Sequence, residues 1–212
     1  MKKTSLISSL VIACLILLPM SSFAIPIAGS GQWGSFTGEM TFSSGILNIS
    51  LTNTSPEANG GYLVGFAFNV PEGIAFNGTY EYSAPPESNF FLTYALNSIN
   101  AAPYGTFDML VATSDSFEGG GPPQAGLPVN SYASFSFEFR GDVSGVTSED
   151  FLNTLSIPTG GGTEGTSFVV RFRGFEVNDA SDKVPYSVPE PGTMLLLGIG
   201  LLGVGIASRR KP

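Results

Sequence analysis

The chain has 212 residues, a formal net charge of −8, no histidine and one cysteine, Cys14. Without histidine it lacks the Ser-His-Asp and Cys-His nucleophile systems, the usual zinc ligand sets and the usual axial ligands of haem. A carboxylate pair of the glycosidase kind is the remaining route to catalysis. No pair of acidic residues lies in a recognisable catalytic motif, so we predict a protein that is not an enzyme and has no cofactor.

The first 24 residues predict a signal peptide. Lys2 and Lys3 precede an apolar stretch at residues 6–18, and Ser22-Phe23-Ala24 places small residues where a signal peptidase requires them. We expect export by the Sec machinery and cleavage after Ala24. Cys14 superficially fits a lipoprotein box, but cleavage there would leave an apolar start instead of the polar tether that lipoproteins carry. Lipidation is therefore the less favoured alternative.

Residues 25–187 form the exported segment, which has the size of one domain. It carries four basic and sixteen acidic residues, a net charge of −12, because most cations of the chain lie in its two ends. A surface of this sign repels phosphate backbones, which argues against nucleic acid as a partner. The segment has no cysteine, so packing must stabilise it without disulfides.

Aromatic and alternating runs, separated by Gly, Pro, Asn and Ser turns, predict about eight antiparallel strands. We expect them at residues 31–42 (a strand or strand pair), 46–52, 62–70, 74–82, 90–96, 106–112, 132–140 and 167–177. Residues 119–123 are expected to be the longest loop, mobile and on the surface. The expected fold class is all-β, an antiparallel β-sandwich of jelly-roll type with one short helix and one polar face on each sheet.

Alternation assigns side chains to the faces of several strands. The strand at 132–140 is expected to be central, because it buries three phenylalanines. The sets expected to share a face are Leu47, Ile49 and Leu51; Tyr62, Val64, Phe66 and Phe68; Ala133, Phe135, Phe137 and Phe139; and Phe168, Val170 and Phe172.

One helix is expected in the exported segment. Thr147 caps it, Asp150 acts as the capping-box carboxylate, and the helix runs through Leu155. Phe151, Leu152 and Leu155 are expected to face inward.

The last predicted strand carries the two arginines that are candidates for a site. Val169, Arg171, Arg173 and Phe175 are expected on the face opposite the apolar set. We expect Arg171 and Arg173 to lie across from Glu138 as a solvated cross-strand ion pair. An arginine-lined ligand face is the alternative.

Two further groups are candidates for ligand binding. Asp179 and Asp182 lie in an oxygen-rich loop of the kind calcium prefers, but the spacing does not match an EF-hand and a polar turn explains it better. We therefore predict no metal site beyond this weak calcium candidate. Six aromatic residues can stack on sugar rings or, more simply, form core and cross-strand pairs. They are Trp33, Tyr80, Tyr82, Tyr94, Tyr104 and Tyr132.

The last 25 residues carry the most specific signal in the chain. Pro189-Glu190-Pro191 holds a carboxylate on an extended segment, an uncharged apolar run follows at residues 192–208, and Arg209-Arg210-Lys211 comes next. As a helix the run reaches ~25 Å, the short end of what spans a bilayer. The basic cluster is expected to act as a cytoplasmic stop-transfer signal, which places the preceding chain outside.

This order of motif, short apolar helix and basic end closely resembles the PEP-CTERM sorting signal of bacterial surface proteins. The same tail has been labelled an ice-binding protein C-terminal domain, a name that implies nothing about ice. The resemblance implies that a membrane-embedded exosortase recognises Pro189, Glu190 and Pro191 and removes the helix, so that membrane anchoring is transient. It also implies a final place on the cell surface or in the extracellular matrix of a Gram-negative-type bacterium.

The expected organisation is therefore a signal peptide (1–24), an exported β-sandwich domain (25–187) and a sorting signal (188–212). We expect a non-enzymatic surface or matrix protein, adhesive or bound to exopolysaccharide. A carboxylate-dependent polysaccharide hydrolase and a permanently membrane-anchored envelope protein are the alternatives.

Overall fold

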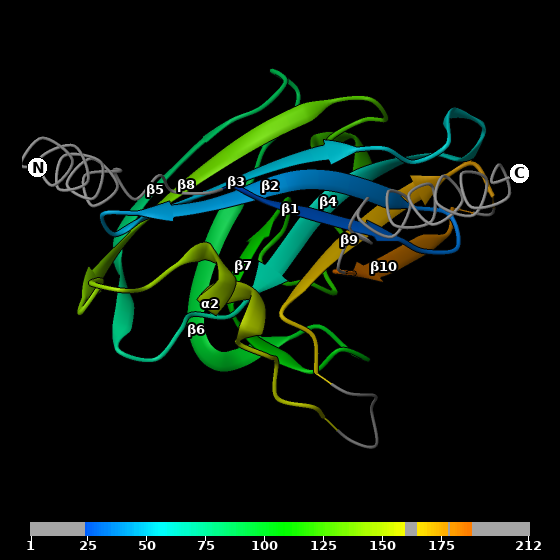
Figure 1. The fold of residues 1–212 in the computed structure, drawn as a ribbon. Coiled ribbons are helices and arrows are strands. Elements are labelled where there is room, and N and C mark those ends of the chain that lie inside the picture. Colours follow the sequence, from blue (N-terminus) through cyan, green and yellow to red (C-terminus); the bar gives the residue numbers. More distant parts are fainter. Residues whose placement is uncertain (1–23, 160–164, 178, 188–212) are drawn as a thin grey trace, which may run out of the picture.

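The described part of the chain is built from two antiparallel sheets that pack face to face (Figure 1). It covers residues 24–159, 165–177 and 179–187 of a computed structural model. One sheet has the strand order β1-β2-β3-β8-β5 and the other β10-β9-β4-β7-β6, so the predicted all-β, two-sheet architecture is confirmed. The strands are β1 (Ile25–Ser30), β2 (Ser35–Ser43), β3 (Ile46–Asn53), β4 (Gly60–Phe68), β5 (Ile74–Ser83), β6 (Phe91–Asn100), β7 (Thr106–Ala112), β8 (Tyr132–Gly141), β9 (Phe168–Phe175) and β10 (Ser181–Pro185).

The chain alternates between the two layers through its middle section. Between β3 and β8 every connection crosses from one sheet to the other except the β6–β7 hairpin. β1 and β2 extend one sheet beyond β3, while β9 and β10 extend the other beyond β4. One side of the sandwich is therefore formed by β1 and β10, and the opposite side by the edge strands β5 and β6.

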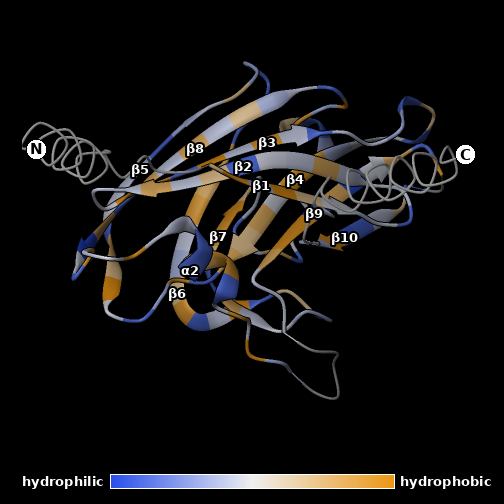
Figure 2. Ribbon diagram, viewed as in Figure 1, coloured by the Kyte–Doolittle hydropathy of each residue, from blue (hydrophilic) through white to orange (hydrophobic). Residues whose placement is uncertain are grey.

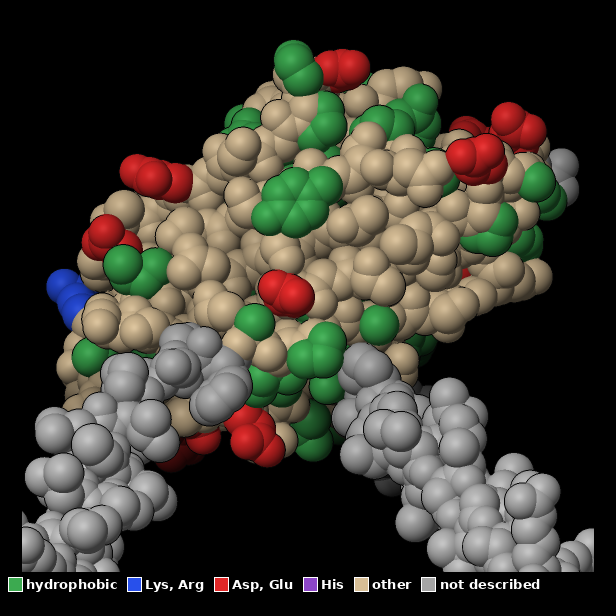
Figure 3. All heavy atoms as spheres, turned by 45° about the horizontal axis from the view of Figure 1, so that its top comes forward, with side chains coloured by type: hydrophobic (Ala, Val, Ile, Leu, Met, Phe, Trp, Pro, Cys, Tyr) green, Lys and Arg blue, Asp and Glu red, His purple; other side chains and the backbone are tan. Residues whose placement is uncertain are grey.

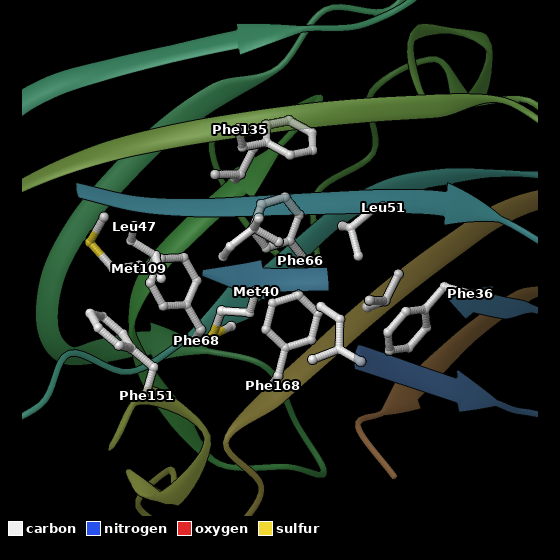
Figure 4. Close-up of a cluster of buried hydrophobic side chains, with 14 of the residues drawn as sticks. Phe36, Met40, Leu47, Leu51, Phe66, Phe68, Met109, Phe135, Phe151 and Phe168 are labelled. Carbon is white, nitrogen blue, oxygen red and sulfur yellow. The ribbon is translucent and has the colours of Figure 1, made fainter. Parts of the chain in front are cut away.

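Phenylalanine side chains fill the space between the sheets (Figure 4). The ring centroids of Phe66 and Phe135 lie 4.9 Å apart, and those of Phe68 and Phe137 lie 5.3 Å apart, both with edge-on geometry. Phe168 stacks beside Phe66 at 5.4 Å. Offset and edge-on aromatic pairs add about 0.5–1.5 kcal/mol each to the free energy of burial, so these contacts hold the layers together.

The predicted alternation is confirmed for the strands next to this core. β8 lies between β3 and β5 and is a central strand, as its phenylalanines predicted. In Figure 2 the hydrophobic colour follows β4, β7 and β9, the strands that bury most of their length. The side chains that face the core as expected are Leu47, Ile49, Leu51, Ala133, Phe135, Phe137, Phe139, Phe168, Val170 and Phe172.

The sheet that contains β4, β7 and β9 is buried on both faces at its centre, so the expected single polar face is wrong for this sheet. A second, smaller apolar cluster covers its outer face, where Phe117 and Tyr104 pack against Leu110 and Val169. These covering residues come from the segments before β7 and after it. A strand that is buried on both sides has no polar face to show in its sequence.

Register shifts change the face of several side chains. In β4 the pairing with β9 shifts between Leu63 and Gly65, so Leu63 joins the core with Phe66 and Phe68. The expected common face of Tyr62 and Val64 with those phenylalanines is therefore wrong. A β-bulge places two residues of one strand opposite one of its partner, which reverses the alternation beyond it.

Both edge strands on the side opposite β1 also carry such irregularities. β5 shifts its register with β8 between Phe76 and Tyr80, and β6 shifts with β7 between Tyr94 and Ile99. Since β6 continues through its bulge to Asn100, the predicted strand end at residue 96 is wrong. The Asp108 carboxylate stabilises the bulge by accepting the Asn97 backbone N–H at 2.6 Å.

Helix α2 (Ser148–Asn153) closes one end of the sandwich. The Thr147 N–H and hydroxyl both donate to Asp150 Oδ2, at 2.7 and 2.8 Å, which confirms the predicted capping pair. Phe151 and Leu152 are buried as expected. Leu155 is 58% exposed, because the helix ends at Asn153, so its predicted inward position is wrong.

Substitutions on the two faces of β8 should differ in their effect on the free energy of unfolding. Phe135→Ala leaves a cavity between the sheets and should lower the free energy of unfolding by about 3–5 kcal/mol. Tyr132→Ala, on the exposed face of the same strand, should change it by less than about 0.5 kcal/mol. Chemical denaturation of the exported domain measures both values, and equal losses would contradict the assigned faces.

Candidate functional site

The predicted sorting tail leaves the fold at the end of β10. β10 pairs with β9 from Ser181 opposite Arg173 to Pro185 opposite Val169, and Val184 is fully buried in the main core. The sequence predicts only a polar turn for this segment. It is a strand of the second sheet, and it brings the end of the domain against its beginning.

The residues after β10 are bonded to the first strand. The Ser187 N–H donates to the Ala28 carbonyl oxygen at 2.9 Å, and the Tyr186 N–H donates to the Phe168 carbonyl oxygen at 2.8 Å. Ala28 and Ser187 thus form an antiparallel bridge between the edges of the two sheets. We call the junction of residues 25–34 with residues 181–187 the closing seam.

Asp182 holds the closing seam together near the start of β10. Its Oδ2 accepts the backbone N–H groups of Trp33 and Gly34 at 2.9 and 3.1 Å, in the turn between β1 and β2. Asp179 is exposed two residues before β10. Asp182 therefore has a structural role, and the described residues contain no group of three or more His, Cys, Asp or Glu side chains that could hold a metal ion.

Close backbone packing in the closing seam requires glycine at two positions of β1 and its turn. A Cβ on Gly29 would collide with the Pro185 carbonyl oxygen, and a Cβ on Gly31 would collide with the Asp182 carboxylate. Glycine permits this approach because it has no side chain. The two ends of the exported domain are therefore packed in direct contact.

Arg171 and Arg173 bind the chain's own loop. Arg171 donates to the carbonyl oxygens of Phe117 and Gly119, and Arg173 donates to those of Gly119 and Gly121. The predicted pairing with Glu138 is wrong, because β8 and β9 lie in different sheets. Glu138 instead accepts a hydrogen bond from the Asn77 side chain.

Burial and charge define the environment of these cations. Arg171 is only 8% exposed, and its pKa lies below the usual value because the guanidinium is buried, while the Glu118 carboxylate acts in the opposite direction. Lys183 on β10 forms an ion pair with Glu118 and donates to the Ala102 carbonyl oxygen. Three of the four cations of the exported segment, all but Arg140, thus anchor the segments that cover the second sheet. The predicted loop at 119–123 is present but is anchored by these contacts.

The aromatic candidates divide between core and surface. Trp33 packs against Phe175, with ring centroids 6.2 Å apart. Phe175 was expected on the outer face, but Gly174 has φ +72° and turns it into the main core. Tyr132 is the most exposed of the six candidates, at 57%.

The other four aromatic candidates contact neighbouring side chains or backbone. Tyr80 and Tyr82 pack on the phenylalanines of β8, Tyr94 meets Phe76, and the Tyr104 hydroxyl donates to the Lys183 carbonyl oxygen. Burial raises the pKa of the Tyr80 hydroxyl. These four therefore follow the simpler interpretation as packed residues.

Several predicted residues fall outside the described ranges. They are Pro189, Glu190 and Pro191, the apolar run at 192–208, and Arg209, Arg210 and Lys211. In the part of the chain that is described, no helix is long and apolar enough to cross a bilayer. Ala24, the predicted cleavage residue, lies exposed directly before β1.

Sequence reasoning missed both strands that build the closing seam. β1 contains a proline, Pro26, which is compatible with an edge strand. Ile25 and Ile27 at a spacing of two were the available signal for it. β10 contains Asp182 and Lys183 in only five residues, a composition that resembles a turn, so its pairing was visible only in three dimensions.

Residues 187–211 match the family model of the PEP-CTERM protein-sorting motif. This match confirms the resemblance inferred from the tail, and it begins at the residue that is bonded to Ala28. Neither a curated protein nor a solved structure matches the chain.

The anchored loop provides a test of the arginine contacts. Arg171→Ala removes the donor from the buried Phe117 carbonyl and should lower the free energy of unfolding by about 1–3 kcal/mol. Hydrogen exchange within residues 113–123 should rise at the same time. Arg140→Ala removes the same charge from an exposed position and should leave both quantities near the wild-type values. Equal behaviour of the two variants would contradict the anchoring role.

Proposed function

We propose that this chain is an exported, non-enzymatic component of the bacterial surface or extracellular matrix that an exosortase processes at Pro189-Glu190-Pro191. The observation that carries the proposal is the PEP-CTERM match at residues 187–211, which implies a protein directed to the cell surface. The match starts at Ser187, the last residue of the described range, whose backbone N–H is bonded to Ala28. The β-sandwich is then the domain that is delivered, and the residues after it are the sorting signal.

The proposed route has three steps. The Sec machinery exports the chain and signal peptidase cuts after Ala24, which leaves Ile25 to begin β1. The apolar run at 192–208 then holds the protein in the membrane, with Arg209-Arg210-Lys211 on the cytoplasmic side. Exosortase action removes the run and frees the domain for the outer surface or the matrix.

A structural or adhesive role is supported by the exposed face of the first sheet. In Figure 3 most of this face has the colour of backbone and uncharged polar side chains, with scattered hydrophobic and acidic ones. A shallow groove of about 210 Å³ crosses it, and its polar lining includes Asn48, Glu81, Ser83, Ser134 and Ser136. Such groups can hydrogen-bond to sugar hydroxyls, so exopolysaccharide is the proposed binding partner. Binding calorimetry with matrix polysaccharide tests this.

The polysaccharide hydrolase is the second candidate function. Its best location is the hollow of about 420 Å³ beside α2, whose lining includes Glu72 and Asp150. Asp150 is committed to the helix cap through Thr147, which favours the structural interpretation of this carboxylate. Glycan cleavage that Glu72→Gln abolishes would replace the non-enzymatic proposal.

The strand order also supports the finer fold assignment. Strands β3, β8 and β5 lie opposite β4, β7 and β6, and the chain crosses between them in nested order. We infer that the sandwich is of the jelly-roll type, with β1, β2, β9 and β10 added at one side.

The processing proposal predicts a defined mass. Protein recovered from the cell surface or medium should begin at Ile25 and end near Pro189-Glu190-Pro191. Glu190→Ala should stay in the membrane at full length, because the recognised carboxylate is lost. Glu176→Ala, an exposed carboxylate upstream, should be processed as the wild type is. Intact-mass spectrometry distinguishes the forms, and a native protein that retains residues 209–212 would favour the permanently anchored alternative.

A further inference from the structure

We propose that the closing seam controls access to the sorting motif: the seam must open from its C-terminal end before the exosortase can bind Pro189-Glu190-Pro191. This inference rests on the proposed function, because it concerns the same processing step. It assigns Asp182 and Ser187 as positioning residues of the substrate, which act through the backbone that precedes the motif.

The first reason is distance. A single residue, Val188, separates the bonded Ser187 from Pro189. Extended chain covers at most about 3.6 Å per residue, so the Cα of Pro189 lies within about 7 Å of the Cα of Ser187. The chain between the bonded Ser187 and the motif is therefore a single residue long, so a bound enzyme must approach within this distance of the closed seam.

The second reason is the supply of backbone donors. Enzymes that bind an extended peptide do so largely through its main-chain hydrogen bonds. Pro189 and Pro191 have no N–H group, so the donors upstream of the motif belong to Val188, Ser187 and Tyr186. In the closed seam the Ser187 N–H is bonded to Ala28 and the Tyr186 N–H to Phe168. When the seam opens, both of these N–H groups become available for hydrogen bonds with the enzyme.

The third reason is that the seam can open without global unfolding. β10 has five residues and lies at the edge of its sheet, where, among the described strands, it is paired along its length only with β9. Short edge elements open locally at a lower free energy than the core. The Asp182 carboxylate opposes this opening, because it ties β10 to the β1–β2 turn. The rate of processing then depends on how often the seam opens.

A covalent lock tests the inference directly. Opposed residues of an antiparallel bridge have Cα atoms about 4.5–5.5 Å apart, within the range that a disulfide spans. Ala28→Cys with Ser187→Cys therefore locks the seam, and the exported segment has no other cysteine. In membranes that contain the exosortase, the oxidised double variant should be processed at least about tenfold more slowly than the same protein after reduction. Wild type receives the same redox treatment as the control.

A loosened seam should act in the opposite direction. Asp182→Ala leaves the Trp33 and Gly34 N–H groups without their acceptor and should raise the processing rate by about fivefold. Asp182→Asn retains an oxygen acceptor and should restore the rate toward wild type. Asp179→Ala removes the same charge from an exposed position and should leave the rate unchanged. Protection of β3 and β8 amides from exchange reports that each variant remains folded.

The outcomes separate this inference from the proposed function. If wild type is not processed, or if Glu190→Ala is processed equally well, the proposed function fails. If processing depends on Glu190 but the oxidised and reduced forms of the locked variant react at equal rates, only the seam inference is overturned. Folded Asp182→Ala that reacts no faster than Asp179→Ala overturns it as well.

Discussion

Contact between the phenylalanines of the two sheets is the interaction on which the rest of the structure depends. The exported segment has no cysteine, so no disulfide joins the layers. Each buried phenylalanine contributes about 2–3 kcal/mol by leaving water, and Phe66, Phe68, Phe135, Phe137 and Phe168 meet at the centre. This packing sets the distance between the two sheets. It therefore also sets how closely β1 approaches β10 at one side of the sandwich.

The few cations of the domain are used internally. Arg171, Arg173 and Lys183 bind carbonyl oxygens or a carboxylate of the chain itself, and they hold the covering loop on the second sheet. Their positive charges are therefore partly shielded from solvent. The outside is left with an excess of carboxylates, and a net charge of one sign opposes association between copies of the domain.

How far the sequence predicted the structure depended on whether a signal was local. β3 and β8 alternate cleanly, so their core residues were assigned correctly, and the capping pair of Thr147 and Asp150 was visible at a spacing of three. The face of Tyr62 was assigned wrongly, because a bulge is a property of paired strands. Burial of the second sheet on both sides requires Phe117, which comes from the loop after β7, where no periodic pattern predicts its position.

The candidate site shows the same division. The sorting motif is contiguous, and it was found from the order of its parts. The closing seam joins Trp33 to Asp182 and Ala28 to Ser187, and no periodicity within either segment indicates such a pairing. Arg171 and Arg173 were recognised as unusual, but their partners are backbone carbonyls, which every residue carries and which therefore leave no mark on a sequence.

The irregular edge strands have a consequence for contacts between copies of the domain. A straight exposed edge offers a row of free N–H and C=O groups to which another molecule can add a strand, and repeated addition produces fibres. β5 and β6 are both interrupted, at Phe76–Tyr80 and at Tyr94–Ile99. The interruptions break the row into pieces too short to template a neighbour. Strand addition between copies of the domain is thereby disfavoured along this side of the sandwich.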